Sequence, residues 1–294
     1  MGVCASTQSS PISPRKQTRP RKQAFPKRIV IVRHGQSQGN VDEAEYGRTA
    51  DWQIALTEEG ILQAHACGEA LRQLVGPKGK LFVYCSPYKR CKQTLAEMLS
   101  VSGHTEGVSC HVREEPRLRE QDFGNFQDAA AMIECKRSRQ LFGRFYYRFP
   151  NGESGADVYD RVSTWLESFF REIEHGTRID GDTTVVLCTH GLTGRLFLMR
   201  WYHWEVDQWE RTRNPPNCAH LVMERKACAN SEVDQWSRYG YRHGYELTEE
   251  SQITIGLKAA DGGEFERHEP DRPGINVKYS TASGSIGRPV SVSV

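Results

Sequence analysis

An arginine-histidine pair at the end of a short buried strand is the feature of this sequence with the clearest chemistry. Residues 29–39 read Ile-Val-Ile-Val-Arg-His-Gly-Gln-Ser-Gln-Gly, so Arg33 and His34 follow a β-branched run and precede a polar loop with Gln36 and Ser37. A neutral imidazole can attack phosphorus, and a guanidinium presents a planar, permanently charged fork that matches phosphate oxygens. The pattern indicates phosphate chemistry, with a purely structural strand-end histidine as the alternative.

Two other predicted strands end in residues of the same kind. Residues 81–85 are apolar and lead into Ser-Pro-Tyr-Lys-Arg90, and residues 183–188 lead into Thr-His190-Gly191. In a parallel sheet the carboxyl ends of the strands meet at one edge, and ligands bind outside that edge. We therefore expect the three strand ends to form one crevice.

A long helix is predicted between the first two of these strands. It begins at the N-cap Thr57, carries two acids in its first turn and stops at Gly76-Pro77. Apolar residues at helical spacing predict its buried face, which would consist of Ile61, Leu62, Ala66, Ala70, Leu71 and Leu74.

The remaining helices complete an alternating pattern. They are predicted to begin at Pro87 and at Ser154, where Asp157 stands in capping-box position, and to span residues 192–201. Strands that alternate with helices form a mostly parallel sheet with helices on both faces. We therefore expect an α/β fold, a three-layer sandwich.

Four separated motifs of this chain resemble those of the histidine phosphatase superfamily, also called the phosphoglycerate-mutase-like family. In chain order they are Arg33-His34-Gly35 with Asn40, Ser86 to Arg90 with Gln93-Thr94, Glu120, and His190-Gly191. Residues 118–127, Leu-Arg-Glu-Gln-Asp-Phe-Gly-Asn-Phe-Gln, and residues 149–154 are similar to a subgroup of phosphoglycerate-mutase-like proteins and broad-range phosphatases. The resemblance covers residues 28–225 and implies the phosphoglycerate-mutase-like fold for that domain.

The resemblance also implies a role for each motif residue. His34 is the expected nucleophile, which forms a phosphohistidine, and Glu120 is the expected general acid for the leaving oxygen. The side chains expected to bind the transferring phosphoryl group are Arg33, Asn40, Arg90 and His190, with Gln36, Ser37 and Gly191 as secondary candidates. Neighbouring carboxylates that could replace Glu120 as the acid are Glu114, Glu115, Asp122 and Glu153. No metal or other cofactor is expected, because cationic side chains supply the electrostatic role.

The expected reaction is metal-independent hydrolysis of a phosphomonoester on a phosphorylated small molecule. Phosphoglycerate mutase is the alternative within the family, but cofactor-dependent mutases have an Arg-His-Tyr-Gly stretch where residues 124–127 read Gly-Asn-Phe-Gln. A bisphosphatase of the fructose-2,6-bisphosphate type would come with a kinase half, and no GxxxxGK[ST] loop is present. A membrane-tethered scaffold that binds a phosphorylated partner without turnover is the alternative of another class.

The charge distribution argues against a nucleic-acid-binding body. The net charge is +2, but residues 1–28 hold seven Lys or Arg and no acid, so the remainder has 32 basic and 37 acidic residues. A mildly acidic body repels nucleic acid. Nine cysteines without metal-ligand spacing are typical of a reduced intracellular protein. The body contains no apolar run of membrane-spanning length, so we expect a soluble domain.

The N-terminal arm, residues 1–27, carries a lipidation pattern. Met-Gly2-Val-Cys4-Ala-Ser6 fits N-myristoylation of Gly2, and Cys4 stands where a palmitoyl chain is often added. A single myristoyl chain holds a protein only marginally on a bilayer, and a second chain or a basic cluster makes the anchor stable. We expect a disordered basic arm that tethers a cytoplasmic protein to the cytosolic face of a membrane. The alternatives are a disordered extension with an accidental Gly2 and a transit-like sequence.

The remaining segments are expected to carry specificity or to be flexible. Residues 41–55 and 126–150 are variable insertions, in which the resemblance places substrate specificity. Most of the aromatic residues in these segments are expected to pack in the core. The alternative is that they line the substrate cavity. The extension of residues 226–257 has no clear pattern, and residues 258–294 are Gly/Ser-rich and predicted to be flexible. The motifs identify neither the substrate nor the oligomeric state.

Overall fold

The computed structural model describes residues 25–76, 78–104, 106–107, 109–124, 129–175, 178–226 and 244–259. The N-terminal arm with Gly2 and Cys4 and nearly all of the predicted C-terminal tail lie outside these ranges, so their lipidation and flexibility stay predictions. Among the helices within the ranges, none combines the length and the apolar character needed to cross a bilayer.

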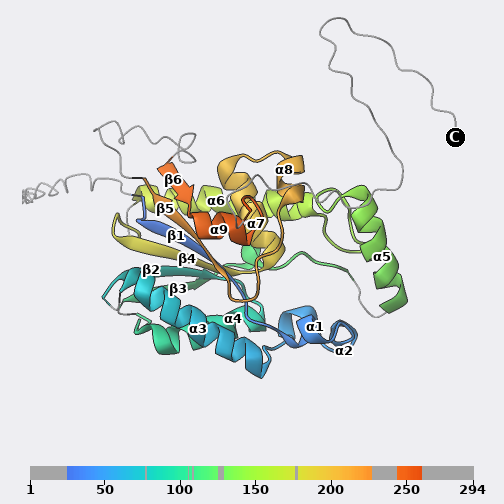
Figure 1. The fold of residues 1–294 in the computed structure, drawn as a ribbon, viewed down its shortest axis with the longest axis horizontal. Helices are drawn as coiled ribbons and strands as arrows, with labels where there is room; N and C mark the ends of the chain where they lie inside the picture. The colour runs from blue at the N-terminus through green and yellow to red at the C-terminus, as the bar shows by residue number, and fades with distance from the viewer. Residues whose placement is uncertain are drawn as a thin grey trace, which may run out of the picture.

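The described residues form one six-stranded sheet in the order β3-β2-β4-β1-β5-β6 (Figure 1). The strands are β1 Arg28–Arg33, β2 Lys80–Cys85, β3 Cys110–Glu114, β4 Thr183–Thr189, β5 His220–Arg225 and β6 Tyr245–Leu247. β3, β2, β4 and β1 are parallel, whereas β5 pairs antiparallel with both β1 and β6. The predicted α/β fold with a mostly parallel sheet is confirmed.

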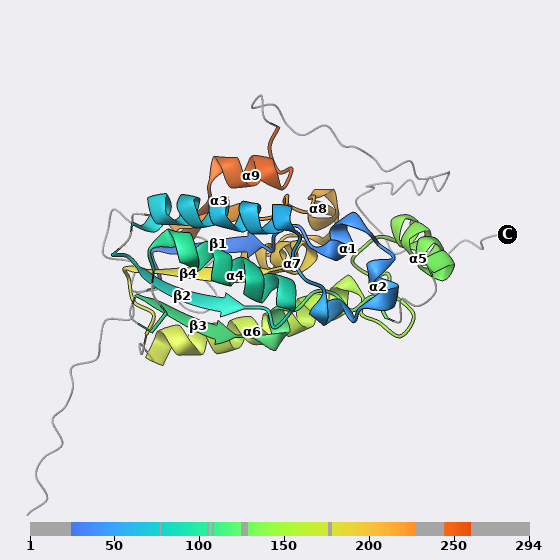
Figure 2. The same ribbon diagram turned by 90° about the horizontal axis from the view of Figure 1, so that it is seen from below.

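Helices cover both faces of this sheet (Figure 2). The four long ones at the sheet are α3 Glu58–Val75, α4 Lys89–Ser102, α6 Gly155–His175 and α7 Gly191–Tyr202. Side chains alternate along a strand, so Val30 and Val32 pack in the cluster with α3 and α4, while Ile29 and Ile31 pack in the cluster with α6 and α7. β4 lies between two parallel neighbours and is buried at every position, which explains its continuous run of residues without charge.

The helix predicted from Thr57 is present, and its predicted buried face is confirmed at Leu71, which is buried, and at Leu74, which packs against the core, but is wrong at Leu62 and Ala66. The N-cap is as expected, since Thr57 Oγ1 accepts a hydrogen bond from the Gly60 N–H at 3.0 Å. The buried residues are mainly small ones, namely Gly60, Ala64, Cys67, Gly68 and Leu71, and Leu62 and Ala66 are exposed. The cause is the close approach of α4, because a Cβ at Gly68 would lie 2.3 Å from the Met98 carbonyl oxygen.

Several further elements have no counterpart in the sequence predictions. Besides β3, β5 and β6 they are α1 Gln38–Val41, α2 Glu45–Arg48, α5 Ala129–Phe142, α8 Val206–Arg211, α9 Glu249–Thr254 and the 3-10 turns η1 Asp51–Gln53 and η2 Pro116–Leu118. β6 pairs with β5, and Ser251 of α9 accepts a hydrogen bond from the Val222 N–H at 2.9 Å. The fold therefore continues past residue 225 into the extension of 226–257.

The contact of α3 with α4 is open to a mutational test. We expect Gly68→Ala to lower the free energy of unfolding by about 1–3 kcal/mol, because the added methyl group cannot fit against the α4 backbone. Leu62→Ala on the same helix should change it by less than about 0.5 kcal/mol, since Leu62 is exposed. Urea unfolding followed by circular dichroism measures both, and equal effects would refute the assigned face.

Candidate active site

Three neighbouring strands bring the predicted residues to one edge of the sheet. The parallel register pairs Arg33 of β1 with Thr189 of β4 and Cys85 of β2 with Cys188 of β4, so the residues that follow each strand emerge side by side. The His34 N–H donates to the Thr189 carbonyl oxygen at 3.0 Å. The imidazoles of His34 and His190 meet edge to face with ring centroids 5.1 Å apart. The chain segments are distant in sequence, and the structure makes them one site.

The His34 imidazole is held in one tautomer and in its neutral form. Its Nδ1 lies 2.7 Å from the Gly35 carbonyl oxygen, which can only accept, so Nδ1 carries the proton and Nε2 keeps its lone pair. Burial lowers the pKa of His34 well below its ordinary value of 6.5, and the charges of Arg90 and Arg33 lower it further. Nε2 is thus an available nucleophile at neutral pH.

His190 presents a polar atom toward the same space. Its Nε2 lies 2.8 Å from Ser86 Oγ, and Ser86 Oγ also lies 3.4 Å from the Tyr88 N–H. With Ser86 donating to Nε2, the proton of His190 resides on Nδ1, which is buried and has no hydrogen-bond partner among the described residues. Burial, together with Arg90, lowers the pKa of His190 well below 6.5. The ring is therefore a neutral N–H donor.

Two arginines add positive charge to this edge. Arg90 is buried, its NH1 donates to the carbonyl oxygen and to Oδ1 of Asp51, both at 2.7 Å, and its guanidinium lies 4.8 Å from the Tyr88 ring centroid. Arg33 NH1 donates to the Pro215 carbonyl oxygen at 2.7 Å. The Nε atoms of both arginines are buried without a partner in the described part of the chain. Both cations are fixed in place while each retains an N–H that can bind an anion.

Asn40 is oriented by its neighbours. Its Oδ1 accepts from the Ser37 N–H at 3.1 Å, from Ser37 Oγ at 3.2 Å and from Asn217 Nδ2 at 3.2 Å, and Asn217 Nδ2 also donates to the His34 carbonyl oxygen at 3.0 Å. With its oxygen used in this way, Asn40 keeps its amide N–H groups as donors. Ser37 therefore positions Asn40 and is not itself placed to bind phosphate.

The two other secondary candidates have structural surroundings. Gln36 Oε1 accepts from Thr57 Oγ1 at 2.9 Å, so its side chain belongs to the start of α3, and this geometry does not support the predicted phosphate contact. Gly191 is buried at the first position of α7, and a Cβ there would lie 2.8 Å from the side chain of Asn214. Its small size is required by packing.

Glu120 is held by contacts with α6, α7 and its own neighbour in the chain, and its carboxyl group lies within electrostatic range of Arg90 and Arg33. Arg161 of α6 donates to the Glu120 carbonyl oxygen at 3.0 Å, and Glu120 Oε1 accepts from the Gln121 N–H at 3.0 Å. Thr193 Oγ1 of α7 lies 3.4 Å from the same oxygen. Burial raises the pKa of Glu120 above 4.5, although the Gln121 N–H and the charges of Arg90 and Arg33 lower it. The environment extends the pH range in which this carboxyl keeps its proton.

The other carboxylates proposed as alternatives are engaged elsewhere. Glu114 pairs with Lys92 at 2.8 Å and Glu115 with Arg117 at 2.7 Å. Glu153 pairs with Arg119 and Arg161 and accepts from the Asp122 N–H at 3.0 Å, so it organises the loop before α6. Asp122 accepts from the Gly124 N–H at 2.8 Å. Among these carboxylates, the geometry favours Glu120 as the acid.

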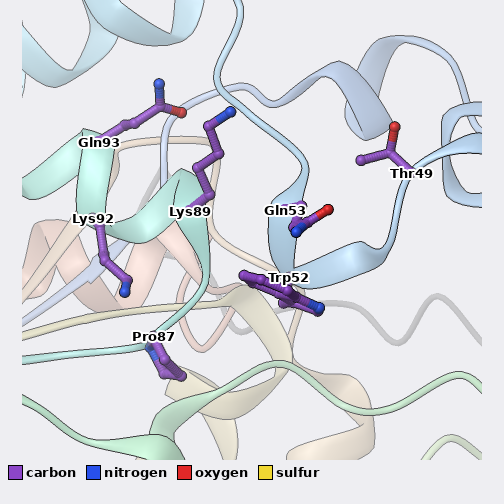
Figure 3. Close-up of a pocket in the computed structure, with 7 residues that line it drawn as sticks. All are labelled: Thr49, Trp52, Gln53, Pro87, Lys89, Lys92 and Gln93. Atoms are coloured by element: carbon purple, nitrogen blue, oxygen red, sulfur yellow. The ribbon is translucent and has the colours of Figure 1, made fainter.

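A cavity of ≈ 440 Å³ opens beside Arg90. Its lining is Tyr46, Gly47, Arg48, Thr49, Ala50, Asp51, Trp52, Tyr88, Asp122 and Gly124, which come mostly from the predicted specificity segment 41–55. A second cavity of ≈ 470 Å³ shares Thr49 and Trp52 with the first and lies against the first turn of α4 (Figure 3). The sequence reasoning missed Asp51 and Asn217 as site residues, and it gave Ser86 no role although Ser86 belongs to one of the motifs. Nothing in the local sequence shows which cation, ring or carbonyl these side chains reach.

Comparison with known proteins identifies the family to which this chain belongs. Residues 29–237 match the histidine phosphatase superfamily (branch 1), and the chain belongs to this superfamily. It is 45% identical over 214 residues to the phosphoglycerate mutase-like protein AT74H of Arabidopsis thaliana, covering 69% of this chain and 75% of that protein. It is 31% identical over 296 aligned positions to the broad-range acid phosphatase DET1 of Saccharomyces cerevisiae, covering 71% of this chain and 89% of that protein.

Solved structures share the fold. A mycobacterial glucosyl-3-phosphoglycerate phosphatase in complex with VO3 superposes with a TM-score of 0.53 at 23% identity, over 76% of this chain and 97% of that one. A structure titled mycobacterial hydrolase 1 gives a TM-score of 0.55, also at 23% identity and with the same coverage. These likenesses support the phosphoglycerate-mutase-like sandwich.

The contact of Ser86 with His190 predicts a kinetic effect. Ser86→Ala should lower kcat for phosphate ester hydrolysis about tenfold, the equivalent of one hydrogen bond of about 1.4 kcal/mol, because His190 loses the partner that fixes its tautomer. Ser86→Thr keeps a hydroxyl and should restore most of the rate. Steady-state kinetics test the pair, and an unchanged kcat in Ser86→Ala would show that the hydroxyl does not orient the ring.

Proposed function

We propose that this protein is a metal-independent phosphomonoester phosphatase that acts through a phosphohistidine on His34. The supporting observation is the donor set of the site, in which Arg33 Nε, Arg90 Nε and His190 Nδ1 are buried without partners in the described residues and lie beside the neutral His34. A buried donor without an acceptor costs about 1–3 kcal/mol. A phosphoryl group supplies the oxygens that these donors lack.

The reaction takes place in two steps. In the first, His34 Nε2 attacks phosphorus, the bond from phosphorus to the ester oxygen breaks, and the leaving oxygen takes the proton of Glu120. In the second, water attacks the phosphohistidine, the phosphorus–nitrogen bond breaks, and Glu120 takes a proton from the water. Arg33, Arg90, Asn40 and His190 bind the equatorial oxygens, where their charge and N–H groups stabilise the transition state more than the ground state.

Phosphoglycerate mutase is the second candidate, because relatives of this chain include proteins with that name. A mutase must return the phosphoryl group to a bound sugar acid and therefore needs cations for the substrate carboxylate. Among the described residues, the lining of the cavity beside Arg90 instead contains Asp51 and Asp122 and a single cation, Arg48, which is paired with Asp42 at 2.7 Å. This lining favours transfer to water.

Replacement of the nucleophile tests the proposal directly. The purified protein should hydrolyse an aryl phosphate without added metal, and His34→Ala should reduce kcat by at least about 10³-fold, since no phosphohistidine can form. Gln36→Ala, which alters a neighbouring side chain outside the site, is the matched control and should keep most of the activity.

Full hydrolysis by His34→Ala would refute the mechanism. Interconversion of 2- and 3-phosphoglycerate that depends on a bisphosphorylated primer, without comparable hydrolysis, would establish the mutase instead.

The raised pKa of Glu120 gives a pH prediction. The first step needs the protonated carboxyl, so kcat/KM for an alkyl phosphate should fall as the pH rises through that raised pKa. Glu120→Gln should remove this limb of the profile and lower kcat/KM by about 10²–10⁴-fold on an alkyl phosphate, but by less on p-nitrophenyl phosphate, whose leaving group needs little protonation. Asp122→Asn is the control. Equal losses on both substrates would argue against acid catalysis by Glu120.

A further inference from the structure

The segment that carries Glu120 has no regular secondary structure once η2 has ended. Backbone carbonyl groups in such a segment need hydrogen-bond donors from elsewhere, and here side chains supply them. Thr189 Oγ1 of β4 donates to the Leu118 carbonyl oxygen at 2.7 Å, and Thr193 Oγ1 of α7 donates to that of Arg119 at 2.8 Å. Side chains of the neighbouring elements therefore determine where this segment, and with it Glu120, lies.

A single arginine of α6 makes more contacts with this segment than either threonine. Arg161 NH1 donates to the carbonyl oxygens of Arg117 at 2.6 Å and Arg119 at 3.0 Å, and its NH2 donates to that of Glu120 at 3.0 Å. Its Nε and NH2 also donate to Oε1 and Oε2 of Glu153, at 3.1 and 3.0 Å. A guanidinium has five N–H groups, and these five contacts use all of them. A lysine, whose three donors share one atom, cannot reproduce this set.

The first turns of α6 fix the position of Arg161. Ser154 precedes the helix and forms the predicted capping box with Asp157, since the Ser154 N–H donates to Asp157 Oδ2 at 2.7 Å and the Asp157 N–H donates to Ser154 Oγ at 3.2 Å. Val158 and Val162, on either side of Arg161 in these turns, are completely buried in the core. The guanidinium therefore extends from a rigid helix that is anchored in the core.

Glu153, which comes directly before the capping box, extends these contacts past Glu120. Its carboxylate accepts from Arg119 NH2 at 2.5 Å and from the Asp122 N–H at 3.0 Å, and its own N–H donates to the Asp122 carbonyl oxygen at 2.7 Å. The side chains of Arg161 and Glu153 are only 11% and 15% exposed, so water competes little for their charge-assisted hydrogen bonds. The pair thus holds the backbone on both sides of Glu120.

We propose that Arg161 is a positioning residue for acid catalysis, which holds the backbone around Glu120 so that its carboxyl group meets the leaving oxygen of the substrate. This inference rests on the proposed function, in which Glu120 protonates that oxygen. Arg161 acts through Glu120 and not on the substrate, because its N–H groups are used by acceptors of the protein itself. A displacement of a catalytic group by about 1 Å can cost about 10²-fold in rate, so the loss of a contact that only fixes the backbone has a large kinetic effect.

Esters with different leaving groups test this role through kcat/KM, which reports the steps up to formation of the phosphohistidine. Arg161→Met should lower kcat/KM about 10–100-fold on an alkyl phosphate, and by less on p-nitrophenyl phosphate, whose leaving group needs little protonation. Arg161→Lys keeps a cation beside Glu153 and should show a smaller loss on the alkyl ester. Arg171→Met, which replaces an exposed arginine of the same helix, is the matched control and should behave like the parent.

A double-mutant cycle separates positioning from a merely structural role. In a Glu120→Gln background, Arg161→Met should cause no further loss on the alkyl phosphate, because the carboxyl group that it positions is already absent. An equal loss in both backgrounds, or equal losses on the two esters, would overturn the role. Circular dichroism checks that each variant is folded. Where Arg161→Met is not folded, Arg161→Lys takes its place in the cycle with the same outcomes.

Failure of this role is distinguishable from failure of the proposed reaction. A parent protein that hydrolyses neither ester would refute the phosphatase and the role of Arg161 together. A parent that hydrolyses both esters and loses this activity in His34→Ala, while Arg161→Met keeps the parent's ratio of alkyl to aryl kcat/KM, would refute only the role of Arg161.

Discussion

The site depends on the register of three parallel strands. β4 lies between β1 and β2, and its pairing places Thr189 opposite Arg33 and Cys188 opposite Cys85. A shift of one residue in either pairing would turn each following side chain to the opposite face of the sheet. The chain holds this register with backbone contacts at the strand ends themselves, where the His34 N–H and the Ser86 N–H donate to β4 carbonyl oxygens at 3.0 and 2.9 Å. His34, His190 and the helix that carries Arg90 are thus positioned by the most buried part of the fold.

Burial then determines the chemistry that these positions can perform. Two imidazoles beside two guanidiniums cannot all be charged in a desolvated space, and the imidazoles are the groups that lose their protons. The same desolvation raises the pKa of Glu120. One physical cause therefore favours a neutral imidazole at His34 and extends the pH range in which Glu120 keeps its proton, while the Asp51 carboxylate balances Arg90 without using its Nε.

The residues at the strand ends of the site were predictable from the sequence, but the contacts that surround and orient them were not. Buried strands followed by Arg33-His34, Arg90 and His190 predicted both the sheet and the convergence of these residues, because a parallel sheet leaves its strand ends only one common edge. The surroundings of Asn40 depend on Asn217, which is 177 residues away, and no local pattern reveals such a contact. The buried face of α3 was predicted only in part for a related reason, since the periodicity of large residues does not show that α4 approaches closely enough to require Gly68.

The strand-end residues of the site and the segments that surround it differ in how the fold constrains them. The positions of His34, Arg33 and His190 follow directly from the β1 and β4 register. The segments 41–55 and α5 add few core side chains, yet they line the cavity beside Arg90 and carry six exposed apolar residues. Apart from Asp51, which pairs with Arg90, these segments contact the rest of the fold through surface pairs such as Lys136 with Glu43. The segments 41–55 and α5, which would decide which esters reach the site, can therefore vary in sequence while the strand-end residues stay the same.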